Sequence, residues 1–140
     1  MSTSATDLFN YRRRQSSVVH IGSIDMGGDN PIRIQSMTTT NTNDTASSIA
    51  QAERIIEAGG ELVRLTTQGS REAENLKNIN AGIRADGYKT PLVADIHFNP
   101  HVADVAALYA EKVRINPGNY VDPARKFVHQ EYTDEEYAQE

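Results

Sequence analysis

Short apolar runs alternate with longer segments of helical periodicity between residues 32 and 116, and this alternation limits the fold more than any other feature of the chain. The runs predict strands, which cover 32–37, 62–66, 91–97 and 112–116. Strand, helix, strand, repeated at intervals of about thirty residues or less, is typical of parallel βα units. We therefore expect an α/β fold built on a parallel sheet.

Residues that begin and end helices lie between the predicted strands. The expected N-cap residues are Asp44, Ser70 and Asn99, the last followed directly by a proline. Glycines at 59–60 and at 87 end the first two helices. Each helical segment carries apolar residues on one face, as packing against a sheet requires.

Four βα units are half of a (β/α)₈ barrel, which typically needs about 250 residues. A doubly wound sheet of five or six strands stays open as the alternative. The apolar content is low for a free-standing domain, and a four-stranded parallel sheet exposes an edge. The sequence therefore predicts the first half of a TIM (β/α)₈ barrel, as the N-terminal portion of something larger.

Two further segments precede the predicted βα units. Residues 1–16 are polar, lack the apolar core of a secretory signal and are expected to form a flexible N-terminal arm. Residues 17–22 predict a short strand, and the turn-rich segment 25–31 separates it from the strand at 32–37. These two strands are expected to pair as a short N-terminal β-hairpin, so residues 17–140 form the half-barrel.

Composition excludes several classes of protein. A net charge of −5 argues against nucleic-acid binding and against a polybasic membrane anchor. The apolar runs are too short to span a bilayer. The absence of cysteine excludes a disulfide scaffold and a thiolate-held metal site built from this chain. We expect a cytoplasmic protein.

Polar side chains gather on one face of the predicted strands, toward their carboxyl ends. Side chains alternate between the two faces of a strand, which places the polar ones opposite the helical layer. The candidate site residues are Gln35, Arg64, Asp95, His97, Arg114 and Asn116, with Asn119 in the loop that follows. Barrel enzymes carry their catalytic groups at this end of the strands, called the mouth here.

Two arginines and a histidine at one mouth favour an anion, above all a phosphate or diphosphate, because the guanidinium fork matches phosphate oxygens. Two structural interpretations stay open beside this one. Asp95 can pair with Arg64 or Arg114 in a buried layer of ion pairs, and His97 can be a core histidine with satisfied hydrogen bonds.

Four segments resemble the N-terminal part of the 4-hydroxy-3-methylbut-2-enyl diphosphate synthase family. They are PIRIQSMTTT (31–40), ELVRLTT (61–67), PLVADIHF (91–98) and KVRINPGN (112–119). VADIHF followed by RINPGN at this separation is highly specific to the family, and the resemblance covers roughly residues 12–140. The segment KFVHQEYTDEEYAQE (126–140) resembles the longer, three-domain form.

The resemblance implies an oxidoreductase of the non-mevalonate isoprenoid pathway. The family reductively opens 2-C-methyl-D-erythritol 2,4-cyclodiphosphate, with loss of water, to give 4-hydroxy-3-methylbut-2-enyl diphosphate. A [4Fe–4S] cluster in a C-terminal domain delivers electrons from a ferredoxin or flavodoxin, and the enzyme is commonly a homodimer.

The barrel of the family holds the diphosphate. Matched by motif, Arg64 and Arg114 grip phosphate oxygens, while His97, Asp95 and Asn116 line the same mouth. The resemblance implies that the cluster ligands, the insertion domain, the rest of the barrel and the proton donor fall beyond Glu140. We assign no catalytic residue within the chain and expect it to be inactive alone.

Two other functions stay open at this point. One is a different diphosphate-handling barrel, such as a transferase of the dihydropteroate synthase type, which needs a pterin pocket and no iron–sulfur cluster. The other is a non-catalytic phosphate-binding module, which folds cooperatively as a separate unit.

Overall fold

The computed structural model describes residues 14–97, 99–120 and 133 of the 140-residue chain. Most of the expected N-terminal arm, residues 1–16, lies outside this part, as does almost all of the segment 126–140. In chain order the elements are β1 (Val19–Ile21), β2 (Ile24–Met26), β3 (Gln35–Met37), α1 (Thr45–Glu57), β4 (Leu62–Thr67), α2 (Ser70–Ala85), β5 (Leu92–Ile96), α3 (Pro100–Ala106), β6 (Lys112–Arg114) and α4 (Pro117–Tyr120).

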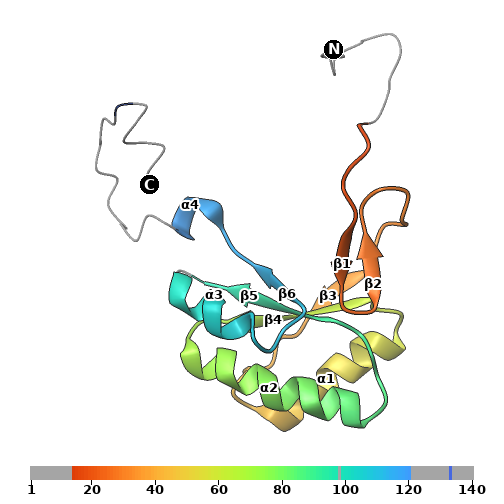
Figure 1. Ribbon diagram of the computed structural model, residues 1–140. Coiled ribbons are helices and arrows are strands. Elements are labelled where there is room, and N and C mark those ends of the chain that lie inside the picture. The colour runs from red at the N-terminus through yellow and green to blue at the C-terminus, as the bar shows by residue number, and fades with distance from the viewer. Residues whose placement is uncertain (1–13, 98, 121–132, 134–140) are drawn as a thin grey trace.

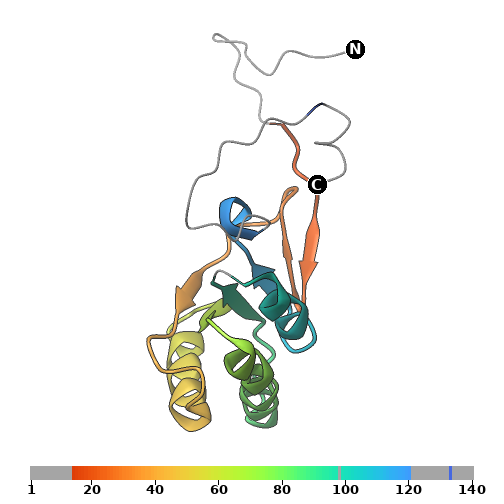
Figure 2. The same cartoon turned by 90° about the vertical axis from the view of Figure 1, so that its left-hand side faces the viewer.

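The main sheet has four parallel strands in the order β3-β4-β5-β6, so each strand lies beside the next one in sequence. Helices α1, α2 and α3 connect them and lie on one side of the sheet (Figures 1 and 2), with α2 packed against both neighbours. A doubly wound sheet reverses its strand order and places helices on both faces. The observed order with one helical layer is that of a barrel wall, which confirms the predicted partial TIM barrel.

The N-terminal hairpin forms, but between other strands than the sequence predicted. β1 pairs antiparallel with β2, which lies in the segment expected to be a turn, and Gly22 turns the chain between them at a φ of 55°. The segment 32–37 instead contributes β3, which pairs parallel with β4. The prediction was wrong because the shorter turn at 22–23 closes the hairpin, while the backbone of 34–37 is engaged by β4.

The helix starts are largely those predicted. Asp44 caps α1 by accepting a hydrogen bond from the backbone N–H of Ser47, and Asn99 caps α3 by accepting one from His101. The predicted cap of α2 was wrong by one residue: Gly69 is the N-cap and makes no side-chain cap bond, while Ser70 is already helical. Gly69 has extended backbone at this position, which allows the helix to start directly after the β4 loop.

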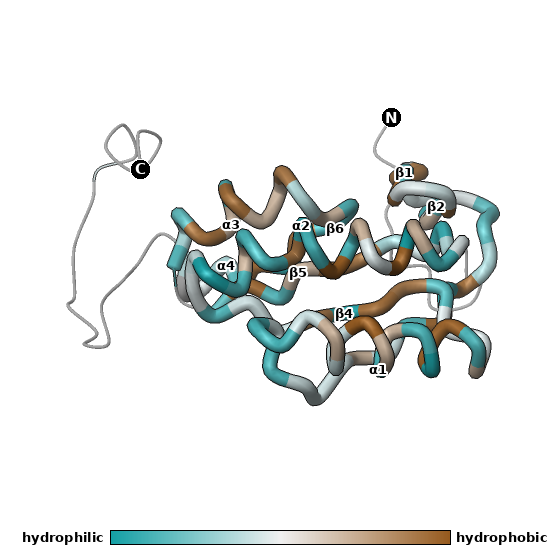
Figure 3. The backbone as a smooth tube through the Cα atoms, turned by 90° about the horizontal axis from the view of Figure 1, so that it is seen from below, coloured by the Kyte–Doolittle hydropathy of each residue, from teal (hydrophilic) through white to brown (hydrophobic). Residues whose placement is uncertain are grey.

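Two apolar clusters hold the sheet on its two faces. The larger lies between the sheet and the helices, where Figure 3 shows β4 as a mostly hydrophobic run beside helices of mixed character. The smaller, here called the floor cluster, consists of Ile21, Leu62 and Val93, with Ile24 and Met26 packed against it. It lies on the face opposite the helices, called the open face here, at the amino ends of the strands.

The edge strand β3 departs from the predicted packing. Ile32 and Ile34 were expected to face the helical layer, but they are 95% and 61% exposed. Both residues precede β3, which is the edge strand of the sheet and begins only at Gln35. Among the described helices, none combines the length and apolar character needed to cross a bilayer.

Candidate functional site

Asp95 lies near the carboxyl end of the central strand β5, and its side chain is only 1% exposed. Both carboxylate oxygens are engaged by cations. Arg64 donates from Nη2 to Oδ2 at 2.5 Å, and Arg114 donates from Nη1 to Oδ1 at 3.1 Å. His97 Nε2 lies 3.3 Å from Oδ2. These four residues, from three adjacent strands or their ends, are called the arginine cluster below.

The surroundings of Asp95 keep it ionised. Burial acts to raise the pKa of Asp95, but the hydrogen bond and charge of Arg64, the hydrogen bond of His97 and the charge of Arg114 hold that pKa below the ordinary value. Two guanidinium groups face one carboxylate, so the cluster carries an excess of positive charge. The structure therefore contains the predicted ion pairs and still has a cationic mouth.

The basic side chains of the cluster reach the solvent, whereas the carboxylate does not. The side chain of Arg114 is 44% exposed, and those of Arg64 and His97 are about a third exposed. Each arginine donates one N–H group to Asp95, and a guanidinium group has five N–H groups in all. Arg64 Nε is buried and has no hydrogen-bond partner among the described residues. Both arginines thus have further N–H groups besides the one that binds Asp95.

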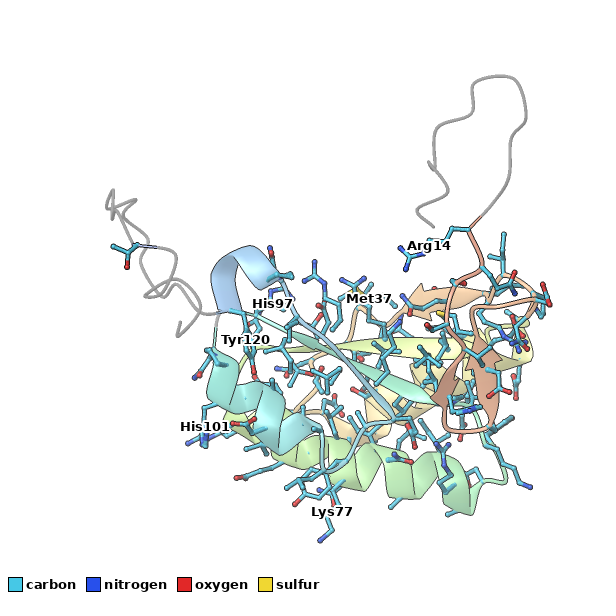
Figure 4. All side chains as sticks on the ribbon, turned by 45° about the horizontal axis from the view of Figure 1, so that its top comes forward. Arg14, Met37, Lys77, His97, His101 and Tyr120 are labelled. Carbon is cyan, nitrogen blue, oxygen red and sulfur yellow. The ribbon has the colours of Figure 1, made fainter. Side chains whose placement is uncertain are left out.

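A pocket of about 200 Å³ opens beside Arg114. Polar and apolar side chains from β5, β6 and the segments that follow them share its wall, which consists of Ile96, His97, Asn99, Arg114, Ile115, Asn116 and Tyr120. In Figure 4, His97 and Tyr120 lie on the same side of the molecule, while Lys77 and His101 lie on the helical side. The pocket offers guanidinium, imidazole and amide groups next to an apolar wall.

The structure brings together five of the predicted site residues. Four form the arginine cluster, namely Arg64, Asp95, His97 and Arg114, and the fifth, Asn116, lies in the wall of the adjoining pocket. Its amide oxygen accepts a hydrogen bond from the backbone N–H of Gly118, which fixes the first turn after β6. Gln35 is elsewhere, because it pairs with Leu62 and so lies toward the amino end of the sheet. Asn119 lies in α4, and its side chain is outside the described part of the chain.

The floor cluster closes the open face below the arginine cluster. Val93 precedes Asp95 by two residues on β5 and shares its face, and Leu62 stands in the same relation to Arg64 on β4. The hairpin covers these two apolar side chains through Ile21. The floor cluster therefore fills the open face at the amino ends of these two strands.

Two glutamates that the sequence analysis did not single out anchor the strand beginnings. Glu61 accepts hydrogen bonds from Ile34 N and Arg33, and Glu111 accepts them from Leu92 N and Arg84. Each glutamate begins the same pattern, Glu-x-Val-Arg, at 61–64 and 111–114. That repeat was the available signal, because it places each of Arg64 and Arg114 three residues after an anchoring glutamate, on the two strands that flank β5.

The described residues contain no group of three or more histidines, aspartates and glutamates arranged to hold a metal ion. The sequence also lacks cysteine, the residue that holds iron–sulfur clusters. The residues of this chain therefore do not fit the cluster that the resemblance implies, and we derive no step through it.

Comparison with known proteins gives a consistent family. Residues 16–137 match the model of the GcpE TIM-barrel domain. A protein of Phocaeicola vulgatus is 75% identical over 134 residues and one of Bacteroides fragilis is 71% identical over 134 residues. Both matches cover 96% of this chain, but 22% and 21% of the respective relatives. A more distant match in Chlorobaculum tepidum is 50% identical over 133 residues, which are 95% of this chain and 18% of the relative.

All three relatives carry the name 4-hydroxy-3-methylbut-2-en-1-yl diphosphate synthase (flavodoxin). The chain spans about a fifth of the length of these curated relatives. The arginine cluster lies within residues 16–137, the part of this chain that matches the family model.

Proposed function

Because the chain belongs to the GcpE TIM-barrel domain family, we propose that it forms the diphosphate-binding part of a 4-hydroxy-3-methylbut-2-en-1-yl diphosphate synthase. The observation that carries the proposal is the convergence of Arg64 and Arg114, from strands on either side of β5, on one solvent-facing mouth. Residues 17–140 are then the first half of the barrel, preceded by an arm at 1–16.

The substrate of this proposal is 2-C-methyl-D-erythritol 2,4-cyclodiphosphate, whose ring is opened by a two-electron reduction with loss of water. Arg64 and Arg114 bind phosphate oxygens through charge-assisted hydrogen bonds, which are shorter and stronger than neutral ones. His97 and Asn116 line the same mouth, and Ile115 and Tyr120 give the pocket an apolar wall for the carbon skeleton.

The redox chemistry belongs to other residues of the complete enzyme. A [4Fe–4S] cluster supplies the electrons when bound, and the cysteine-free chain leaves its ligands to a separate domain. The name of the relatives includes flavodoxin, which favours a flavodoxin over a ferredoxin as the electron donor. Homodimer formation and a cytoplasmic location are part of the same proposal.

The family match favours this function over the two alternatives, a pterin-using transferase and a non-catalytic phosphate module. The test uses the full-length protein that contains this segment, purified without oxygen. We expect four-iron absorbance and conversion of the cyclodiphosphate when reduced flavodoxin is supplied. A protein without iron, or one that leaves the cyclodiphosphate unchanged, contradicts the proposal.

A further inference from the structure

Asp95 carries the wrong charge for a ligand of a diphosphate. A carboxylate beside an anion is repelled by it, so a group that only lined the mouth would weaken binding. Asp95 is also 1% exposed, whereas the side chains of Arg64, His97 and Arg114 around it are between 29% and 44% exposed. The carboxylate therefore lies behind the arginines with respect to the solvent.

Each side-chain hydrogen bond of Asp95 among the described residues is with a basic side chain of the mouth. Oδ1 accepts from Arg114, while Oδ2 is shared by Arg64 and His97. The two arginines come from opposite neighbours of β5 and bind different oxygens. One carboxylate thus fixes two guanidinium groups relative to each other across three strands.

We propose that Asp95 is a positioning residue, which holds Arg64 and Arg114 at the spacing required by the two phosphates of the ligand and does not touch the ligand itself. The inference rests on the proposed function and adds a residue role to it. It replaces the expectation that Asp95 lines the mouth as a substrate-binding group.

The strand register explains how one aspartate on β5 can bind an arginine on each neighbouring strand. Asp95 pairs directly with Arg114 on β6, while Arg64 lies two residues closer to the amino end of β4 and extends upward to the same carboxylate. The buried Val93 and Leu62 of the floor cluster fill the space below. The guanidinium of Arg64 therefore stays at the level of Asp95, next to the mouth.

A ligand meets arginines whose side-chain freedom is already restricted. Long side chains lose rotamer freedom when they are immobilised, and a pre-organised site avoids that loss during binding. The surrounding basic side chains, Arg64 first among them, lower the pKa of Asp95. The carboxylate therefore stays ionised and continues to bind both guanidinium groups. Removal of the Asp95 charge should strengthen diphosphate binding if only net charge matters. The same change should weaken binding if Asp95 pre-organises the arginines, so the two roles can be told apart.

The experiment measures the Kd of inorganic diphosphate by calorimetry, with the full-length protein and its Asp95→Asn variant. Positioning predicts that Asp95→Asn weakens binding at least tenfold, although the mouth gains positive charge. The effect should shrink in an Arg114→Ala background, because Asp95 acts through Arg114. Asp104→Asn, an exposed change on α3, is the matched control and should leave the Kd unchanged.

Asp95→Glu covers the case in which Asp95→Asn fails to fold. It keeps the charge and displaces the carboxylate, so positioning predicts weaker binding here too. Equal or tighter binding by a folded Asp95→Asn, or by Asp95→Glu, overturns the role of Asp95 alone. A wild-type protein that does not bind diphosphate overturns the proposed function, and this inference with it.

Discussion

The two ends of the open face are built from the same strands and differ in almost every property. At the amino end, Leu62 and Val93 are buried under the hairpin and contact apolar groups. Two residues further along the same strands, Arg64 and Asp95 form a charged cluster that opens to solvent. In barrel enzymes the carboxyl end of the strands carries the chemistry and the amino end carries stability. On the open face, β4 and β5 each change from a buried apolar residue to a charged site residue over a distance of two residues.

Leu62→Ala is the largest expected disruption of the floor cluster. Leu62 is buried against Ile21 and Val93, so the truncation leaves a cavity and should cost about 2–5 kcal/mol of stability. Denaturant unfolding of the full-length protein measures this loss. The Kd of diphosphate should stay unchanged under native conditions, and a loss of affinity at unchanged stability would contradict the division between the two ends.

Gly22→Ala should act on the same end with a smaller effect. Gly22 has a φ of +55°, and a Cβ there would lie 3.1 Å from Cγ of Glu111 and 3.2 Å from Cγ of Pro91. The left-handed backbone alone costs about 1–2 kcal/mol for a residue with a Cβ. Gly118→Ala is the matched control near the mouth, because its Cβ meets Asn116 Oδ1 at an ordinary 3.5 Å. Equal melting temperatures for the two variants would argue against the hairpin as a support of the floor.

The pH dependence of stability should differ between the two ends. The pKa of Asp95 is lowered in the folded protein, so ionised Asp95 stabilises the fold above the ordinary aspartate pKa. That contribution is lost as the pH falls through the lower, folded-state pKa. The difference in Tm between wild type and Asp95→Asn should therefore shrink in acid. The difference for Leu62→Ala should stay constant, because no titratable group is removed, and parallel curves for both variants would contradict this account.

Much of this arrangement was predictable from the sequence, because strand side chains alternate. That rule placed Arg64, Asp95 and Arg114 on one face, and the βα spacing predicted the parallel sheet. The hairpin partners were not predictable, since turn residues occur both at 22–23 and at 27–30. The choice between them depends on how Ile21 packs on Leu62 and Val93, which is tertiary information.

The candidate site was predicted in part for the same reason. Residue type and alternation identified the arginine cluster and left a buried layer of ion pairs open as one interpretation. They did not show that Asp95 is far more buried than the arginines that bind it. Tyr120 joins the pocket only because the chain turns after β6, a path that local sequence does not determine. Gln35 was placed at the mouth because the sequence does not fix the register of β3 against β4.

The central claim is that the mouth, through Arg114 and its partners, binds a diphosphate. Calorimetric titration of the full-length protein with inorganic diphosphate tests it most directly, with Arg114→Ala compared against Arg54→Ala at the exposed end of α1. Arg114→Ala should lose about 1.5–3 kcal/mol of binding free energy, the magnitude of a hydrogen bond to a charged group. Arg54→Ala should bind like the wild type. Equal affinities for the wild type and Arg114→Ala would remove Arg114 from the site and contradict the account.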